Sequence, residues 1–375
     1  MRSNYGEPLR KWLKQQTLHE IIDFGDLPVF ESATTYPCIL IVSKLNKKIN
    51  SFDVTNVKTL KFESLQSYIQ QNRDLLNKNS LDDKGWNLAS DTENNLLNKL
   101  KNNSVSLSDY VKGEIFYGIK TGLNEAFVID EATKTKLITE DKRSEEVIKP
   151  FLAGRDIKKY QTPIIDKYLI FFPKGFTNRL GNNPKHGWKW LSENFSAVAS
   201  YLKQFEDAGK KRYDQGDYWW ELRACDYYAA FEKPKIMLPD IALRMQALYD
   251  VNNFYCVNTA YIIPVDDKFL LGILNSNVVQ YYYAQLSSSI RGGYLRFIKQ
   301  YLATIPIPKK HQFKEEIINL VDQLLKLNKE KAESKLQTSV SQLEIKIDYC
   351  EDRINKIVYQ LNELTADEIK IVEGK

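Results

Sequence analysis

Short apolar runs bounded by glycine and proline mark the first fifty residues of the chain. Residues 9–17 have helical spacing, and the runs 20–24 and 37–42, both rich in branched side chains, follow them. Runs of this length between turn-forming residues are typical of buried strands. Residues 1–50 therefore predict a helix, a strand, a loop and a second strand. This unit is too small to fold alone and resembles the last part of a larger α/β sheet.

Residues 51–110 carry a different pattern. They are polar, rich in asparagine and lysine, and show only weak helical periodicity near residues 60–76 and 96–107. Weak periodicity in a polar segment favours peripheral helices over a core. We interpret this segment as a helical connector.

Residues 111–308 have the pattern of short strands mixed with helices. Residues 114–118 and 126–130 are predicted to be paired strands, because the turn formers Gly122 and Asn124 lie between them. Strands and helices mixed in this way indicate an α+β domain over residues 111–308. The further strands are expected at 168–172, 235–238 and 255–263, and the helices at 188–205 and 267–285.

The last segment, residues 309–375, contains heptad seams. It begins after Ile305-Pro-Ile-Pro308, whose two prolines cannot continue a helix or a central strand. Apolar residues recur every three or four positions from Phe313 to Leu327 and again from Val340 to Leu364. The seams are out of register, so residues 328–339 are either a stutter or the turn of an antiparallel hairpin. We favour the hairpin, which serves as a rigid spacer, a subunit contact or a simple packing element.

Composition restricts the class of protein. A chain of 375 residues with 43% hydrophobic and 27% charged residues fits two or three folded modules. There is no apolar run long enough to span a membrane and no signal-peptide pattern at the N-terminus, so we expect a cytoplasmic protein with no membrane partner. The cysteines are far apart in apolar or helical contexts and are expected to be reduced, buried thiols: Cys38, Cys225, Cys256 and Cys350.

Charge is unevenly distributed. The net charge is only +5, yet residues 268–314 contain no aspartate or glutamate. Basic and aromatic residues alternate in this stretch, which fits contact with a polyanion such as DNA as well as it fits a solvated face.

The sequence offers no visible active site. An adenine methyltransferase needs an Asn-Pro-Pro-aromatic or related motif and a glycine-rich donor loop, and neither is present. The Glu-x-Lys pairs at 344–346 and 368–370 fall within heptads, and His19, His186 and His311 share no motif. We therefore predict no catalytic, cofactor-binding or metal-binding residues in this chain.

Several stretches nevertheless resemble a known family. Residues 20–30 and 33–41 are similar to the end of the catalytic domain in type IIG restriction-modification enzymes. Residues 118–130, 148–157, 274–276 and 305–308 are similar to the TaqI-like C-terminal specificity domain, and residues 357–361 and 364–374 match the ending of such proteins. The glycines and other motif residues in these stretches are expected to mark the fold: Gly118, Gly122, Gly154, Asn275 and Pro306.

The resemblance implies a fold and an activity. It implies a partial methyltransferase α/β sheet, a mixed α/β target-recognition domain and a C-terminal helical hairpin. It also implies methylation of adenine N6 from S-adenosylmethionine by a catalytic domain that is not in this chain, with or without an endonuclease activity. We therefore expect a fragment or a split subunit that has no enzymatic activity alone and works with a methyltransferase catalytic domain in cis or in trans.

Candidate DNA contacts fall into two groups. Base contacts require side chains that pair with base edges in the major groove, and phosphate contacts require cations. The base-contact candidates are Arg244 and Gln246, with Arg223 weaker; the phosphate candidates are Lys120, Arg155, Arg291, Arg296 and Lys299. For Arg244 a surface ion pair is an equal alternative. Residues 210–212 are either a DNA-facing loop or simply solvated, and we favour solvation. Tyr281, Tyr282 and Tyr283 are expected to pack in the core and not to stack on bases.

Two functions remain open. The first is sequence-specific recognition of double-stranded DNA for a restriction-modification methyltransferase, and the basic stretch at 268–314 favours it. The second is a helical assembly subunit of a restriction or phage-defence complex with incidental DNA contact, and the long heptads favour that.

Overall fold

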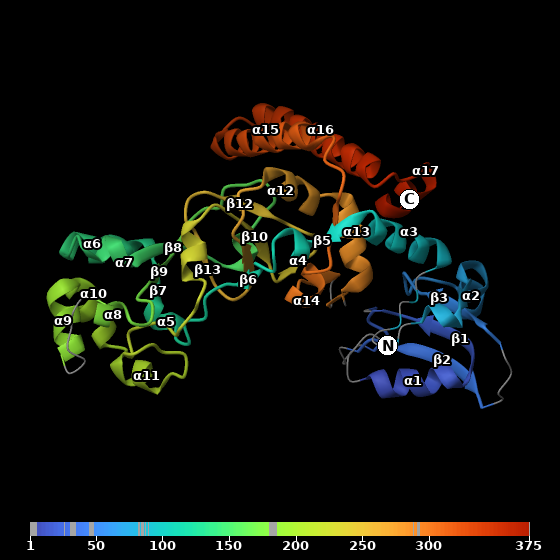
Figure 1. Cartoon of the computed structure of the whole chain (residues 1–375), viewed down its shortest axis with the longest axis horizontal. Helices are drawn as coiled ribbons and strands as arrows, with labels where there is room; N and C mark the ends of the chain where they lie inside the picture. The colour runs from blue at the N-terminus through green and yellow to red at the C-terminus, as the bar shows by residue number, and fades with distance from the viewer. Residues whose placement is uncertain are drawn as a thin grey trace.

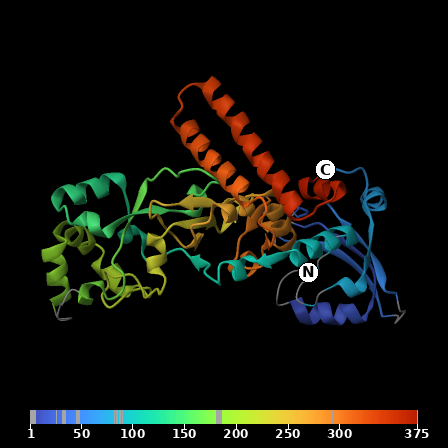
Figure 2. The same ribbon diagram turned by 45° about the horizontal axis from the view of Figure 1, so that its top comes forward.

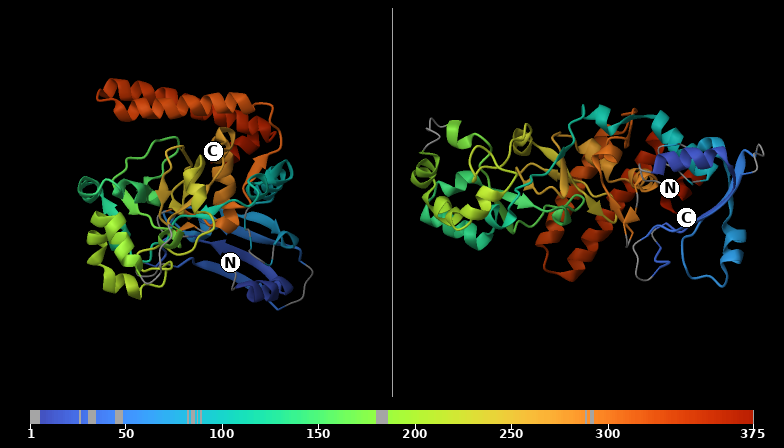
Figure 3. Two further views of the ribbon diagram at one scale, coloured as in Figure 1. Left: turned by 60° about the vertical axis from the view of Figure 1, so that its left-hand side comes forward. Right: turned by 90° about the horizontal axis from the view of Figure 1, so that it is seen from below.

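The computed structural model gives an elongated α+β arrangement (Figure 1). The N-terminal sheet lies at one end, a lobe of helices from within residues 131–211 lies at the other, and two further sheets lie between them (Figure 3). The structure describes residues 6–25, 27–30, 35–44, 49–81, 83, 86, 88, 90–179, 186–287, 289–290 and 293–374.

The N-terminal unit is a four-stranded sheet with a helix packed against it. Strand β1 pairs in antiparallel fashion with β2 and in parallel with β3, and the strand order is β2-β1-β3-β4. Leu13 and Ile21 are buried in its core with Trp86. The predicted helix and two strands are thus confirmed. The elements are α1 (Glu7–Gln15), β1 (Thr17–Asp23), β2 (Cys38–Ser43), β3 (Ser51–Asn56), α2 (Leu65–Asn72) and β4 (Asp74–Asn77).

The segment expected to be a helical connector also contains strands β3 and β4, which were not predicted, although helix α2 lies within the expected range of 60–76. Strand β3 lies inside the N-terminal sheet between β1 and β4. Phe52 and Val54 are buried while Asp53 is half-buried, which is the period-two alternation of a strand. The helical expectation holds further on, where Ser90 and Glu93 form a capping box for α3 (Asp91–Asn102).

Two sheets form the middle of the molecule. The first has the order β12-β10-β14-β6 and is antiparallel, and the second has the order β13-β8-β9-β7. Their strands are β6 (Phe116–Tyr117), β7 (Val128–Asp130), β8 (Ile148–Leu152), β9 (Lys167–Ile170), β10 (Lys235–Pro239), β12 (Leu248–Asp250), β13 (Tyr255–Cys256) and β14 (Ala260–Ile263).

The expected pairing of residues 114–118 with 126–130 is wrong. Strand β6 pairs with β14, and β7 pairs with β9 in the other sheet. Residues Ala126 and Phe127 belong to the short helix α5 (Asn124–Phe127), where both are fully buried. The chain therefore passes from one sheet to the other at this point, because each strand finds its partner far away in the sequence.

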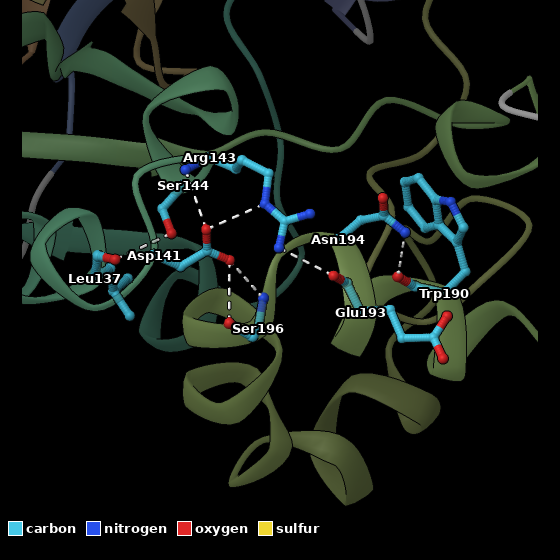
Figure 4. A network of polar contacts seen from close by, with 8 residues as sticks. All are labelled: Leu137, Asp141, Arg143, Ser144, Trp190, Glu193, Asn194 and Ser196. Carbon is cyan, nitrogen blue, oxygen red and sulfur yellow. Dashed lines mark hydrogen bonds and ion pairs between the residues drawn. The ribbon is translucent and has the colours of Figure 1, made fainter.

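The helical lobe at one end is held together by Asp141. Its carboxylate accepts hydrogen bonds from the Ser196 backbone N–H at 2.8 Å and from the Arg143 backbone N–H at 3.1 Å (Figure 4). The Arg143 guanidinium then reaches the carbonyl of Glu193 at 3.0 Å. These bonds hold the pKa of Asp141 below its usual value. The helices are α6 (Glu131–Glu140), α7 (Ser144–Val147), α8 (Phe176–Arg179), α9 (Gly187–Asn194), α10 (Ser196–Lys203) and α11 (Glu206–Lys211).

The C-terminal heptads form the predicted antiparallel hairpin of α15 (Lys314–Glu333) and α16 (Gln337–Leu361), which projects from the body (Figure 2). Arg353 lies 2.6 Å from Glu316 and Lys331 lies 2.8 Å from Glu344, which places opposite ends of the helices together. Its base packs against α12 (Lys268–Leu274), where a Cβ on Gly272 would lie 2.6 Å from Ile317. Within the described residues, no helix has the length and apolarity that a bilayer crossing requires.

The remaining elements link these parts. Strand β11 (Ile241–Ala242) pairs with β16 (Tyr294–Arg296), which pairs with β15 (Ser289–Ile290). The two-proline segment forms β17 (Pro306–Pro308), paired only with β5 (Ser104–Ser106), as prolines require. The other helices are α4 (Leu107–Tyr110), α13 (Asn277–Leu286), α14 (Lys299–Leu302) and α17 (Ala366–Glu373).

Candidate nucleic-acid interface

Three of the residues proposed from sequence as DNA contacts meet at one cavity. Lys120, Arg223 and Arg296 line a space of about 380 Å³ beside strand β6. All three side chains are exposed. They come from segments more than seventy residues apart in sequence, so only the tertiary fold brings them together. The rest of the lining is Tyr117, Gly118, Tyr227, Asp240, Asn258, Tyr261, Phe297 and Ile298.

One carboxylate holds two of these cations. Asp214 Oδ2 lies 3.0 Å from Lys120 Nζ, and Asp214 Oδ1 lies 3.7 Å from Arg223 Nη1. Asp214 is only 8% exposed, whereas the lysine and arginine side chains are about half exposed. The acid therefore fixes the directions of both cations while leaving their surfaces open to a ligand.

The loop that carries Asp214 is anchored by a buried arginine. Arg212 donates to the carbonyls of Thr121, Trp219 and Glu221, and its guanidinium lies 4.3 Å from the centre of the Phe127 ring. Burial lowers the pKa of Arg212 to about 10, so it stays charged at neutral pH. This corrects the expectation that residues 210–212 are simply solvated, because Arg212 is a buried anchor.

Glu221 orders the other side of the same loop. Its carboxylate is fully buried and accepts backbone N–H bonds from Gly175 at 3.0 Å, Thr177 at 2.9 Å and Asp217 at 2.9 Å. Three such bonds satisfy a buried carboxylate without a cation. The loop of residues 212–222 is thus a rigid support for Asp214.

Two glycines clamp the turn that leads to Asn258. A Cβ on Gly118 would lie 2.0 Å from the Val257 carbonyl oxygen, and one on Gly154 would lie 2.3 Å from that of Thr259. Only glycine permits such close backbone approach. Both were expected to mark the fold, and their contacts hold the turn that places Asn258 in the cavity lining.

One residue in the lining of the cavity, Asp240, is an acid. Asp240 directly follows strand β10, and its backbone N–H donates to Thr259 O at 2.8 Å while its carbonyl accepts from Phe297 N–H at 2.7 Å. Burial raises the pKa of the half-buried Asp240 carboxyl, an effect that the nearby Arg296 partly offsets. Sequence reasoning did not select Asp240 or Asn258. Asp240 lies directly after a strand and Asn258 lies in a turn between two strands. Such positions often carry binding residues, so they were the signal in the sequence that could have identified both.

The remaining phosphate candidates differ in position. Lys299 lies at the start of α14 with Nζ 5.9 Å from the centre of the Phe116 ring, next to the cavity-lining residue Tyr117. The Arg155 side chain is 82% exposed and lies 3.7 Å from Asp156, outside the lining. Arg291 lies outside the described residues.

The two base-contact candidates, Arg244 and Gln246, lie in a different cleft, of about 420 Å³, between the segment after β11 and helix α16. Arg244 donates to Asn277 Oδ1 at 3.0 Å, so its partner is an amide and not the acid of a surface ion pair. Asn275 exchanges two hydrogen bonds with the backbone of Ala247 and fixes this segment. Three carboxylates share the cleft: Asp348, Glu351 and Asp352. Residues 240–246 thus run from the basic cavity into an acid-lined cleft.

The stretch without acids in sequence has acids beside it in space. Lys268 lies 2.6 Å from Asp322, and Lys310 pairs with Glu363. Tyr281, Tyr282 and Tyr283 are buried in the core, as expected. Two of the seven basic residues in 268–314 are therefore paired with acids from outside the stretch. Among the described residues, the candidates Arg296 in β16 and Lys299 in α14 form no ion pair with an acid.

Metal and thiol chemistry have little geometric support in the part of the chain that the structure describes. It contains no group of three or more histidine, cysteine, aspartate or glutamate side chains arranged to hold an ion. The four cysteines are free, but Cys38 is exposed and Cys225 is half-buried. The expectation that all four are buried is wrong for these two, because Cys38 lies on the outer strand β2 and Cys225 in an open loop.

Comparison with known proteins agrees with the resemblance found in the sequence. Residues 149–307 match the TaqI-like C-terminal specificity domain. The chain is 23% identical over 335 residues to the type II methyltransferase M.BstVI of Geobacillus stearothermophilus, covering 82% of this chain and 56% of that protein. It is 24% identical over 368 residues to the type II methyltransferase M.BanIII of Aneurinibacillus aneurinilyticus, covering 85% and 61%. The chain thus spans little more than half the length of these relatives.

A solved structure has a similar fold. The type IIL restriction-modification enzyme MmeI, determined in complex with DNA, superposes with a TM-score of 0.52 at 10% identity. The match covers 96% of this chain and 45% of that one. The mixed α/β architecture with C-terminal helices is therefore shared with a restriction-modification enzyme.

Proposed function

We propose that this chain recognises a specific sequence in double-stranded DNA and positions it for a methyltransferase catalytic domain that transfers a methyl group from S-adenosylmethionine to adenine N6. The observation that carries the proposal is the convergence of Lys120, Arg223 and Arg296 on one cavity. Lys120 and Arg223, which Asp214 orients, can contact phosphates. Asp240 and Asn258, which also line the cavity, can contact base edges. The methyl transfer itself is assigned to no residue of this chain.

The specificity-domain match supports the same function. Arg223, Asp240, Asn258 and Arg296 all fall within residues 149–307. Lys120 lies before this range but is held to it by Asp214. The proposed DNA face therefore lies in the matched domain and its immediate support.

A salt series tests the proposal. The chain is titrated with a random duplex at several salt concentrations, and the same is done for R223A/R296A. Each phosphate contact contributes about 0.9 to the slope of log K against log salt, so the slope should fall by about 2 in the double variant. The matched control is K136A/K189A, which removes two lysines about 70% exposed in the helical lobe. The proposal fails if the chain shows no salt-sensitive binding, or if the control lowers the slope as much.

A catalytic partner is supported by the surface of the N-terminal sheet. Strand β2 is the outer strand of the sheet among the described residues, and Ile39, Ile41 and Val42 on it are 42%, 44% and 36% exposed. Exposed apolar strands at a sheet edge are typical of covered or paired surfaces. We propose that the catalytic domain, in cis or in trans, packs here. The variant I39K/I41K should then lose association with that domain while retaining DNA binding.

One observation favours the alternative function, a helical assembly subunit. Ile345 and Tyr349 on α16 are 70% and 68% exposed and line a cavity of about 530 Å³ on the projecting hairpin. Substitution I345K/Y349K distinguishes the functions. An assembly subunit would lose its partners with unchanged DNA affinity, whereas a DNA-recognition subunit would retain its catalytic partner and its activity in the complex.

A further inference from the structure

The basic cavity contains an acid where a site for phosphate alone would exclude one. Lys120, Arg223 and Arg296 line the same cavity as Asp240, which is the acidic residue in the described lining. A carboxylate repels a phosphate and provides it no donor. The cavity therefore suits a ligand that carries negative charge for the cations and a hydrogen-bond donor for Asp240.

Asp240 differs from the two other acids of the site. Asp214 is paired with two cations, and Glu221 accepts three backbone N–H bonds. Asp240 makes no ion pair with any lysine or arginine that the structure describes, although Arg296 lies opposite its neighbour Ile241 in the β11–β16 ladder. Burial raises the pKa of its carboxyl, and backbone N–H groups of its own segment and the charge of Arg296 offset this only in part. A half-buried carboxylate without an ion pair can accept a further hydrogen bond from a ligand, because such a bond would offset the cost of burying its charge.

The backbone around Asp240 is rigid. Both of its backbone polar groups are bonded, one to Thr259 and one to Phe297. Thr259 belongs to the turn clamped by Gly118 and Gly154. A side chain held in this way can distinguish base edges by position, which a mobile side chain cannot do.

We propose, on the basis of the function proposed above, that Asp240 is a specificity residue whose carboxylate accepts a hydrogen bond from the exocyclic amino group of a base in the major groove. Cytosine N4 and adenine N6 supply this donor, whereas guanine and thymine present acceptors at the corresponding position. The surrounding cations bind the backbone phosphates and hold the base pair in register.

Selection from a randomised duplex library tests the inference. The wild-type chain, D240N and the control D166N are each incubated with the library at one salt concentration, and the bound DNA is sequenced. Asp166 is an exposed acid outside the cavity. The wild type and D166N should select the same motif. D240N should lose roughly tenfold discrimination at a single position that is cytosine or adenine in the motif, and keep the others.

Base analogues then identify the donor. In the preferred duplex, adenine at that position is replaced by purine, or cytosine by 2-pyrimidinone, each of which lacks the amino group. Removing the amino group should weaken wild-type binding about tenfold and should weaken binding by D240A, whose side chain has no acceptor, much less. An equal loss for both proteins would overturn the inference, because the carboxylate and the amino group would then not interact.

The outcomes separate this inference from the function on which it rests. If the wild type selects a motif and D240N selects it equally well, the role of Asp240 is refuted and DNA recognition stands. If D240N loses preference at all positions together, Asp240 has a structural role and the inference is also refuted. If the wild type does not bind DNA, both proposals fail. Circular dichroism and thermal unfolding of D240N establish that the variant is folded.

Discussion

Asp214 Oδ2 lies 3.0 Å from Lys120 Nζ, joining the segment before residues 149–307, which match the TaqI-like specificity-domain model, to a loop within them. The same carboxylate orients Arg223. Two cations of the proposed DNA face therefore share one anchor, Asp214, so a substitution of this acid changes the geometry of both cations at once.

The variant D214N should separate affinity from selectivity. Removing one negative charge beside two cations should raise affinity for random duplex roughly two- to fivefold at low salt, while releasing both side chains should reduce sequence selectivity. We expect unfolding to become easier by about 1 kcal/mol, because a mostly buried acceptor loses charge. Titration with random and preferred duplexes measures both effects. The control E206Q removes an acid that also pairs with two lysines, on α11, and should change neither affinity nor selectivity.

Alanine at Gly118 or Gly154 should destabilise the chain. The added Cβ would lie 2.0 Å from Val257 O or 2.3 Å from Thr259 O, so the turn carrying Asn258 must move. We expect a loss of roughly 1–3 kcal/mol in the free energy of unfolding, measured by urea denaturation, with loss of selective DNA binding. Gly113 has a φ of +77° and open space around it, so G113A should lose only about 1 kcal/mol and leave binding unchanged. Wild-type stability in G118A and G154A would contradict the clamp.

The buried pair of Lys235 and Asp250 gives a test of the core. Lys235 Nζ lies 2.5 Å from Asp250, and both side chains are fully buried. K235M leaves an uncompensated buried carboxylate and should lower the free energy of unfolding by roughly 3–5 kcal/mol. Asp250 also accepts N–H bonds from Asn252 and Phe254, which asparagine can retain in part. The double variant K235M/D250N should therefore recover much of the stability, and a strictly additive loss would show that the two groups do not interact.

Asp240 should make stability depend on pH in an unusual direction for an acid. Burial raises its pKa above the ordinary value near 3.8, so the folded chain binds the proton more readily than the unfolded chain. The ionised carboxylate then opposes folding at pH values above its folded pKa, and the opposition disappears below the unfolded value. D240N should be more stable than the wild type at pH 7, and the difference should vanish below the ordinary pKa of an aspartate. Thermal unfolding of both proteins across this range measures it. If the stability of D240N relative to the wild type increased as the pH was lowered, this account would be contradicted.

Local periodicity determined much of the fold. The helix α1, the strands β1 and β2 and the hairpin of α15 and α16 agree with the spacing of apolar residues, because each buries one face whose period follows from its own backbone geometry. The register slip between the two seams allowed either a stutter or a hairpin, and the structure has the hairpin. Strand β3 was missed because its alternating pattern is short and lies within a polar segment.

The candidate site was only partly accessible from sequence. Cationic residue type was enough to select Lys120, Arg223 and Arg296 as DNA contacts, but no sequence spacing indicated that they share a cavity or that Arg244 and Gln246 lie elsewhere. Acids were not considered as part of a DNA face, so Asp214 and Asp240 were missed.

The sequence by itself determined the class of elements, the C-terminal hairpin and the chemical character of the DNA-binding candidates. The tertiary structure alone decided which strands pair, since β6 joins β14 across more than a hundred residues, and which charges face each other. The spacing of apolar residues depends only on which face of a single helix or strand is buried. Pairing and electrostatics depend on distances between segments, and chain folding sets those distances.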